Sequence, residues 1–145
     1  MNKLFGLAFI FCGVLSSVAA FSQGSQPAPT TNSPAQQTKA TIEGLVRDVA
    51  CPVQNPEATA THLSMKCLRA CARKGSPLVI LTKEGELYFP ISAQMPDDGQ
   101  RNKLRPFLGK YVRATGAVYE RKGTHAIMIE KMEELKDVPL KVEDQ

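Results

Sequence analysis

The stretch GKYVRATGAVYERKGTHAIMIEKM, residues 109–132, decides the fold class of this chain. Two parts of it, KYVRATGAVYE (110–120) and THAIMIEKM (124–132), are rich in the β-branched and aromatic residues that favour strands. The link between them, RKG at residues 121–123, contains a glycine and is short enough for a hairpin. The chain is therefore expected to be mainly β.

Three shorter segments upstream of this hairpin also have the composition of strands. They are TIEGLVRDV (41–49), PLVILT (77–82) and ELYFPI (86–91), and a short glycine-containing link joins the last two. A helical turn, NKLRPFLG (102–109), is expected before the fourth strand. Five strands in this order suit a small, partly open five-stranded Greek-key barrel of the OB-like type, with a small α+β sandwich as the alternative.

One clear helix is expected between the first and second strands of this barrel. The segment THLSMKCLRACARKG (61–75) has Thr61 as a candidate N-cap and Gly75 just past its end. Cys67 and Cys71 are four positions apart, so they lie on the same face of the helix. In OB-like barrels this connection borders the usual ligand-binding face, so functional residues are expected on this helix.

The N-terminus has the composition of a secretory signal peptide, assigned to residues 1–22. A basic start is followed by an apolar run at residues 4–15 and then by small residues suited to cleavage. This run is shorter than the ~20 residues of a membrane-spanning helix, so no membrane span is expected after cleavage. Cys12 lies inside the run and is expected to leave with it. We expect a periplasmic or secreted protein, in a compartment where disulfides persist.

The remaining chain divides into three parts. Residues 23–40 are rich in Pro, Gln, Thr and Ser and are expected to form a flexible linker. Residues 41–132 form the expected OB-like domain, and residues 133–145 form a charged C-terminal tail that is expected to fray. The net charge of +4 is modest and interspersed, so no nucleic-acid partner is expected. We expect a monomer whose partner is a small ligand, a metal or a protein.

Three short motifs resemble a group of small exported bacterial OB-like domain proteins of unknown function. They are GLVRDVAC (44–51), KCLRAC (66–71) and the hairpin at 109–132. In that group a Gly-x-Val-x-Asp-x-x-Cys strand precedes a Cys-x-x-x-Cys helix and a Gly-Lys-x-Val-x-x-x-Gly hairpin. The resemblance covers roughly residues 43–132. It implies an exported OB-like domain and brings no activity with it.

Three cysteines remain after the signal peptide: Cys51, Cys67 and Cys71. Residues four apart on a helix have Cβ atoms about 5–6 Å apart, whereas a disulfide requires about 3.8 Å. Cys67 and Cys71 are therefore poorly placed to bridge each other, and both can face Cys51. One hypothesis is a disulfide between Cys51 and either Cys67 or Cys71, which would stabilise the fold by about 3 kcal/mol.

A second hypothesis is a metal site that uses all three sulfurs, since Zn and Cu(I) both accept thiolate ligands. His62 is the possible fourth ligand, although it joins the others only if the helix begins after it, around Ser64. A third is thiol redox chemistry, for which Cys67 lacks the usual place at a helix N-terminus. No hydrolase, phosphate-loop or zinc-protease motif is present. We therefore expect a non-catalytic binding module, with periplasmic thiol redox or metal delivery as the alternative.

Overall fold

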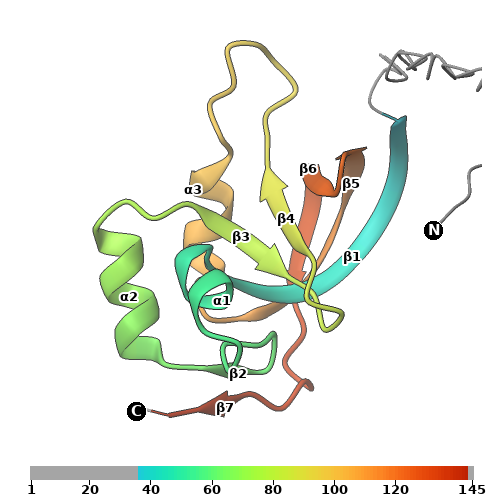
Figure 1. Ribbon diagram of the computed structural model, residues 1–145. Coiled ribbons are helices and arrows are strands. Elements are labelled where there is room, and N and C mark those ends of the chain that lie inside the picture. Colours follow the sequence, from blue (N-terminus) through green and yellow to red (C-terminus); the bar gives the residue numbers. More distant parts are fainter. Residues whose placement is uncertain (1–35, 144–145) are drawn as a thin grey trace, which may run out of the picture. The chain divides into compact units, whose positions relative to one another are not determined.

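The computed structural model describes residues 36–143, and these residues form a closed five-stranded barrel (Figure 1). The predictions for the signal peptide (1–22), for residues 23–35 of the linker and for the last two residues lie outside the described part. The barrel strands are β1 (Gln36–Asp48), β3 (Leu78–Leu81), β4 (Leu87–Pro90), β5 (Tyr111–Arg121) and β6 (Thr124–Glu134).

The order of the strands around the barrel is β1-β3-β4-β6-β5, and β5 closes it by pairing with β1. Only β4 and β6 run parallel, while every other neighbouring pair in the barrel is antiparallel. This is the topology of an OB-like barrel. The predicted fold class is confirmed, including the cysteine-bearing helix between the first two barrel strands.

The first strand is longer than the predicted segment and serves two neighbours. It begins at Gln36 rather than at Thr41 because the long β5 continues to pair with it over that range. From Leu45 onward β1 also pairs with β3. Gly44 stands at this transition, and a Cβ atom there would collide with the carbonyl group of Leu81. The absence of a side chain therefore lets the strands approach closely where the barrel curves.

Helical elements lie at two places between the barrel strands. Between β1 and β3 the chain forms α1 (Ala50–Gln54), the two-residue strand β2 (His62–Leu63) and α2 (Met65–Arg73). Between β4 and β5 it forms α3 (Arg101–Leu104) and the 3-10 turn η1 (Arg105–Phe107). Among residues 36–143 no helix has the length and apolar character needed to cross a bilayer.

Two apolar cores hold this arrangement together. The first core fills the barrel and consists of Ile42, Val46, Leu78, Ile80, Tyr88, Leu104, Val112, Ala114, Val118, Ile127 and Ile129. The second core lies under the segment between β1 and β3 and consists of Leu45, Ala60, Leu63, Leu68, Leu81 and Tyr111. Leu68 is fully buried there, so α2 is attached to the barrel by apolar contact.

The C-terminal segment is ordered, which differs from the frayed tail expected from its charge. The residues of β7 (Lys141–Val142) pair in parallel with β2, and Figure 1 shows the two strands side by side below α2. Leu135, Val138 and Leu140 pack against the second core. Apolar residues between the charges thus anchor the tail, and it borders the segment that carries the cysteines.

Candidate metal centre

The three cysteine sulfurs come together at one place, although their residues belong to two different helices. Cys51 lies on α1 directly after β1, and Cys67 and Cys71 lie on α2. All three Sγ atoms lie within 4.8 Å of one another. The Sγ atoms of Cys51 and Cys67 are 3.1 Å apart. Cys51 and Cys71 are partly buried and Cys67 is exposed, so the group is reachable from solvent.

The orientation of α2 explains why two of the sulfurs point in one direction. The helix begins after Ser64, later than the Thr61 cap predicted from the sequence, and the Ser64 hydroxyl accepts a hydrogen bond from the Cys67 N–H at 3.1 Å. Such an N-cap satisfies a backbone donor that would otherwise lack a partner in the first turn. Leu68 faces the second core, which turns Cys67 and Cys71 toward α1.

Asp48 at the end of β1 positions the third sulfur. Its carboxylate is fully buried, and Oδ2 accepts a hydrogen bond from the Cys51 N–H at 3.0 Å. Its other oxygen, Oδ1, is buried and has no hydrogen-bond partner within the described residues. A buried carboxylate oxygen without a hydrogen-bond partner is energetically unfavourable, and the charge of this carboxylate acts on the thiols of both Cys51 and Cys71.

Arg47 holds the segment between α1 and α2 in place. Its side chain is 2% exposed, and one terminal nitrogen donates to the Thr59 carbonyl at 3.0 Å and lies 3.5 Å from the His62 carbonyl. Arg47 and Asp48 are consecutive strand residues, so they point to opposite sides of β1. Arg47 thus connects the barrel to the segment between α1 and α2, and Asp48 connects it to α1.

The surroundings of the thiols disfavour their ionised form. Burial raises the pKa of the Cys51 thiol to about 11, and the hydrogen bond with Cys67 and the charge of Asp48 act in the same direction. Burial also raises the pKa of Cys71, followed by the charges of Asp48 and Cys51. Reactive redox cysteines require the opposite shift. These two thiols are therefore protonated at neutral pH, and a metal ion would have to displace their protons in order to bind.

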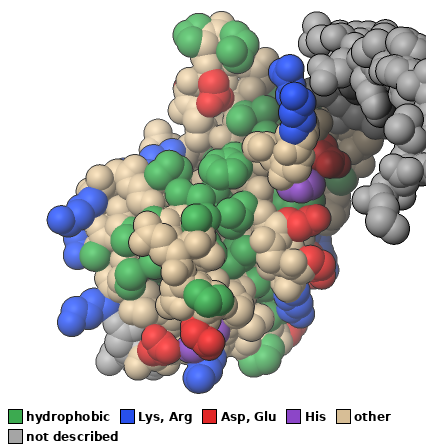
Figure 2. Space-filling view, in the orientation of Figure 1, with side chains coloured by type: hydrophobic (Ala, Val, Ile, Leu, Met, Phe, Trp, Pro, Cys, Tyr) green, Lys and Arg blue, Asp and Glu red, His purple; other side chains and the backbone are tan. Residues whose placement is uncertain are grey.

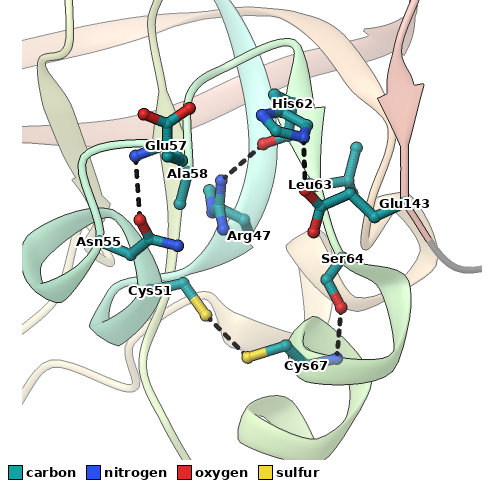
Figure 3. Close-up of a pocket in the computed structure, with 10 residues that line it drawn as sticks. All are labelled: Arg47, Cys51, Asn55, Glu57, Ala58, His62, Leu63, Ser64, Cys67 and Glu143. Carbon is teal, nitrogen blue, oxygen red and sulfur yellow. Dashed lines mark hydrogen bonds and ion pairs between the residues drawn. The ribbon is translucent and has the colours of Figure 1, made fainter.

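A small cavity of about 60 Å³ opens beside Cys51 and Cys67 (Figure 3). That volume holds about two water molecules at roughly 30 Å³ each. The cavity is lined by Arg47, Cys51, Asn55, Glu57, Ala58, His62, Leu63, Ser64, Cys67 and Glu143. A metal held by the three sulfurs would thus have room at its side for a ligand the size of water.

His62, the fourth ligand considered from the sequence, does not belong to the group of three sulfurs. It lies on β2, and its Nε2 atom is 2.8 Å from Oε1 of Glu143, close enough for an ion pair but without the alignment of a hydrogen bond. Figure 3 shows the histidine ring turned toward Glu143, with Cys51 and Cys67 on the other side of the cavity. The ordered tail therefore provides the partner that His62 contacts in this structure.

Sequence reasoning missed the roles of Arg47, Asp48 and Glu143. For Arg47 and Asp48 the sequence did contain an indication, because these two opposite charges stand side by side between the apolar residues Val46 and Val49. Such a pair is rarely buried unless its members have specific partners. No protein-family model, curated protein or solved structure matches the chain. The function must therefore be argued from the chemistry of this cluster.

Proposed function

We propose that this protein is an exported, non-catalytic binding module whose cysteine cluster holds a thiophilic metal ion, Zn(II) or Cu(I). One observation carries the proposal: three sulfurs from two helices lie within 4.8 Å of one another. A disulfide staple would require only two of them. The third, Cys71, has a reason to face the same point if all three bind one ion.

The spacing of the sulfurs supports this proposal. A tetrahedral zinc ion with Zn–S bonds near 2.3 Å places its sulfurs about 3.8 Å apart. The 3.1 Å between the Cys51 and Cys67 sulfurs and the limit of 4.8 Å that contains all three sulfurs lie on both sides of that value. Small side-chain rotations would therefore bring all three sulfurs into a coordination sphere.

Zn(II) and Cu(I) differ in the number of ligands that they require. Cu(I) can be satisfied by three thiolates, whereas Zn(II) in proteins is almost always four-coordinate. For Zn(II) the fourth ligand would be a water molecule in the cavity beside Cys51 and Cys67. An exchangeable fourth position and an exposed Cys67 also suit a metal that is passed to a partner, which is the delivery role considered from the sequence.

A second candidate function has an observation of its own. The Sγ atoms of Cys51 and Cys67 are 3.1 Å apart, and a modest movement would bring them to the roughly 2.05 Å of a disulfide. Such a staple would close the segment between α1 and α2 and leave Cys71 as a free thiol. For a third role, thiol redox catalysis, one expectation from the sequence was wrong, because Cys67 lies in the first turn of α2 and so near a helix N-terminus. The raised pKa of Cys51 still argues against this role.

The metal proposal is tested by titrating the reduced protein with Zn(II), with Cu(I) and with Co(II) as a spectroscopic substitute for zinc. One equivalent should bind, and Co(II) should show thiolate-to-metal charge-transfer absorption. Ser in place of any one cysteine should weaken binding more than about 100-fold, because even outer-shell changes weaken metal sites 10–100-fold. Ala70→Ser, on the same helix but outside the cluster, should leave the affinity unchanged.

Thiol counting distinguishes the two candidates. Alkylation of protein isolated without reductant, followed by intact mass measurement, should find all three thiols only after a chelator has removed the metal. A single reactive thiol that does not change with chelation would establish the staple. Unchanged metal affinity in Cys71→Ser would contradict a three-sulfur site. Fractionation of the producing cells, with the mass of the mature chain, tests the proposed export.

A further inference from the structure

A second cavity, of about 230 Å³, lies against the other side of α2. Residues of α2, β3, α3, η1 and the following loop line it. They are Arg69, Ala72, Arg73, Leu78, Arg101, Arg105 and Leu108, and we call this site the arginine pocket. Figure 2 shows Lys and Arg side chains at the left edge of the molecule, over the position that α2 occupies in Figure 1.

The arginine pocket is separate from the cysteines. Arg69 follows Cys67 by two residues, and Arg73 follows Cys71 by two, so each arginine lies about 200° around the helix from its cysteine. The cavity beside the cysteines shares no lining residue with the arginine pocket. Ligand binding at one site can therefore be tested without changing the residues of the other.

The pocket concentrates positive charge without a compensating carboxylate. Four of the seven lining residues are arginines, and none of the seven is acidic. Arg101 is fixed in place, since its terminal nitrogens donate to the Ala72 and Ser76 carbonyls at 2.7 Å each. Within the described residues, the side chains of Arg69, Arg73 and Arg105 make no ion pair. Like charges gathered in this way repel one another, and an anion would relieve that repulsion.

Several other surface cations of the molecule have a glutamate partner. Several cationic side chains along the barrel strands lie within 4.0 Å of a glutamate oxygen: Lys39–Glu130, Lys110–Glu134, Arg113–Glu43 and Lys131–Glu133. Neutralisation by a neighbouring glutamate is thus common on the barrel. Arg121 and Lys122 at the far end of β5 also lack such a partner among the described residues, so the arginine pocket differs from the rest of the surface in that four arginines line one cavity with no acidic residue among its walls.

The floor and the size of the pocket limit what the ligand can be. Ala72 and Leu108 are half-buried and supply most of the apolar surface, whereas Leu78 is only 3% exposed and lies beneath it. A volume of about 230 Å³ corresponds to roughly eight water molecules in the liquid, which is small for a binding site. Guanidinium groups match phosphate and carboxylate oxygens in a bidentate geometry. These features together fit a compact anion with an apolar part.

We propose that the arginine pocket binds a small organic dianion, either a phosphate monoester or a dicarboxylate. Its charged groups lie among Arg69, Arg73 and Arg105, and its apolar part lies on Ala72 and Leu108. Arg101 holds the end of α2 against α3 and so keeps the arginines from both segments on one cavity.

The test is an NMR titration of the ¹⁵N-labelled protein with probes that separate charge from apolar surface. Phenyl phosphate and phthalate combine a dianion with a ring, inorganic phosphate supplies charge alone, and benzyl alcohol supplies the ring alone. Both aromatic dianions should give saturable shifts at the pocket arginine side chains and at the Ala72 amide. Inorganic phosphate should bind more weakly, and benzyl alcohol should not bind.

The variant Arg69→Gln/Arg105→Gln should weaken phenyl phosphate binding about tenfold or more, since it removes two charge-assisted contacts. Both arginines are exposed, so the barrel should still fold, which the strand signals of the same spectra report. Arg121→Gln, an exposed arginine outside the pocket, is the matched control and should bind normally. Equal binding of inorganic and phenyl phosphate, unchanged affinity in the double variant, or tighter binding of a hexaglutamate peptide would each overturn the proposal.

Discussion

The barrel and the cysteine-bearing insertion, residues 49–77, are held together by different interactions. The barrel has long paired strands and an interior filled with apolar side chains. The insertion has two short helices and a two-residue strand, and a small number of contacts attach it to the barrel, among them Arg47, Asp48, Leu68 and the tail. The barrel thus holds most of the paired backbone, while the insertion carries the sulfurs on short elements that are attached by fewer contacts.

The largest effect should follow from damage to the barrel interior. Ile127 is fully buried in the barrel core, and Ile127→Ala leaves a cavity there. The free energy of unfolding should fall by about 2–5 kcal/mol, measured by urea denaturation. Lys131→Ala, an exposed change on the same strand, should stay within about 0.5 kcal/mol of the parent. Equal stability of the two variants would show that the barrel does not carry the fold.

A smaller and more local effect should follow from Arg47→Met. This change removes the hydrogen bond to the Thr59 carbonyl and leaves a polar group of the insertion without its partner, which costs about 1–3 kcal/mol. Amide hydrogen exchange should become faster at residues 55–64 and stay unchanged in β5 and β6, and metal affinity should fall.

The matched control for this change is Arg113→Met. That substitution removes exposed ion pairs with Glu43 and Glu133, which contribute little to stability. It should leave both the insertion and the metal affinity as they were. Faster exchange throughout the barrel of Arg47→Met would contradict the independence of the two regions.

The smallest effect should appear at alkaline pH in the metal-free, reduced protein. Because the folded state raises the pKa of Cys51 to about 11 from 9.0, the unfolded chain loses this proton first as the pH rises. The contribution of Cys51 to stability is therefore fully present below pH 9.0 and is lost as the pH rises through about 11. Urea denaturation over this range, with thiolate absorbance, measures it.

Two variants sharpen this measurement. Asp48→Asn removes a negative charge that raises the pKa of both Cys51 and Cys71, so the alkaline loss of stability should become smaller. In Cys51→Ala, the fall in the free energy of unfolding that ionisation of Cys51 causes at alkaline pH should be absent. The same alkaline loss in Cys51→Ala as in the parent would assign the effect to another group.

Much of the barrel could be predicted because its signals are local. Alternation and β-branched residues mark β5 and β6, and a short link with a glycine marks their turn. Element boundaries were less predictable. The first strand begins at Gln36 because β5 offers backbone partners that far, and α2 begins after Ser64 because His62 and Leu63 pair with the tail instead. Neither cause is visible in the segment itself.

The candidate site divides in the same way. The spacing of Cys67 and Cys71 places both sulfurs on one helical face, and this follows from the period of the helix alone. The buried Asp48 lies only three residues from Cys51, whereas the approach of Cys51 to the other two sulfurs and the contact of His62 with Glu143 depend on segments far apart in the chain. No local pattern predicts these contacts, because the barrel must close before the segments meet.

The sequence by itself determined a β-rich barrel and a helix that presents two thiols together, since both follow from the periodicity of neighbouring residues. Tertiary structure decided that Cys51 joins them, which the sequence allowed only as a hypothesis, and it alone gathered arginines from two separate helical segments around one cavity. The physical reason is that such clusters are made by long-range packing, and the residues that form them carry no mark of their future neighbours.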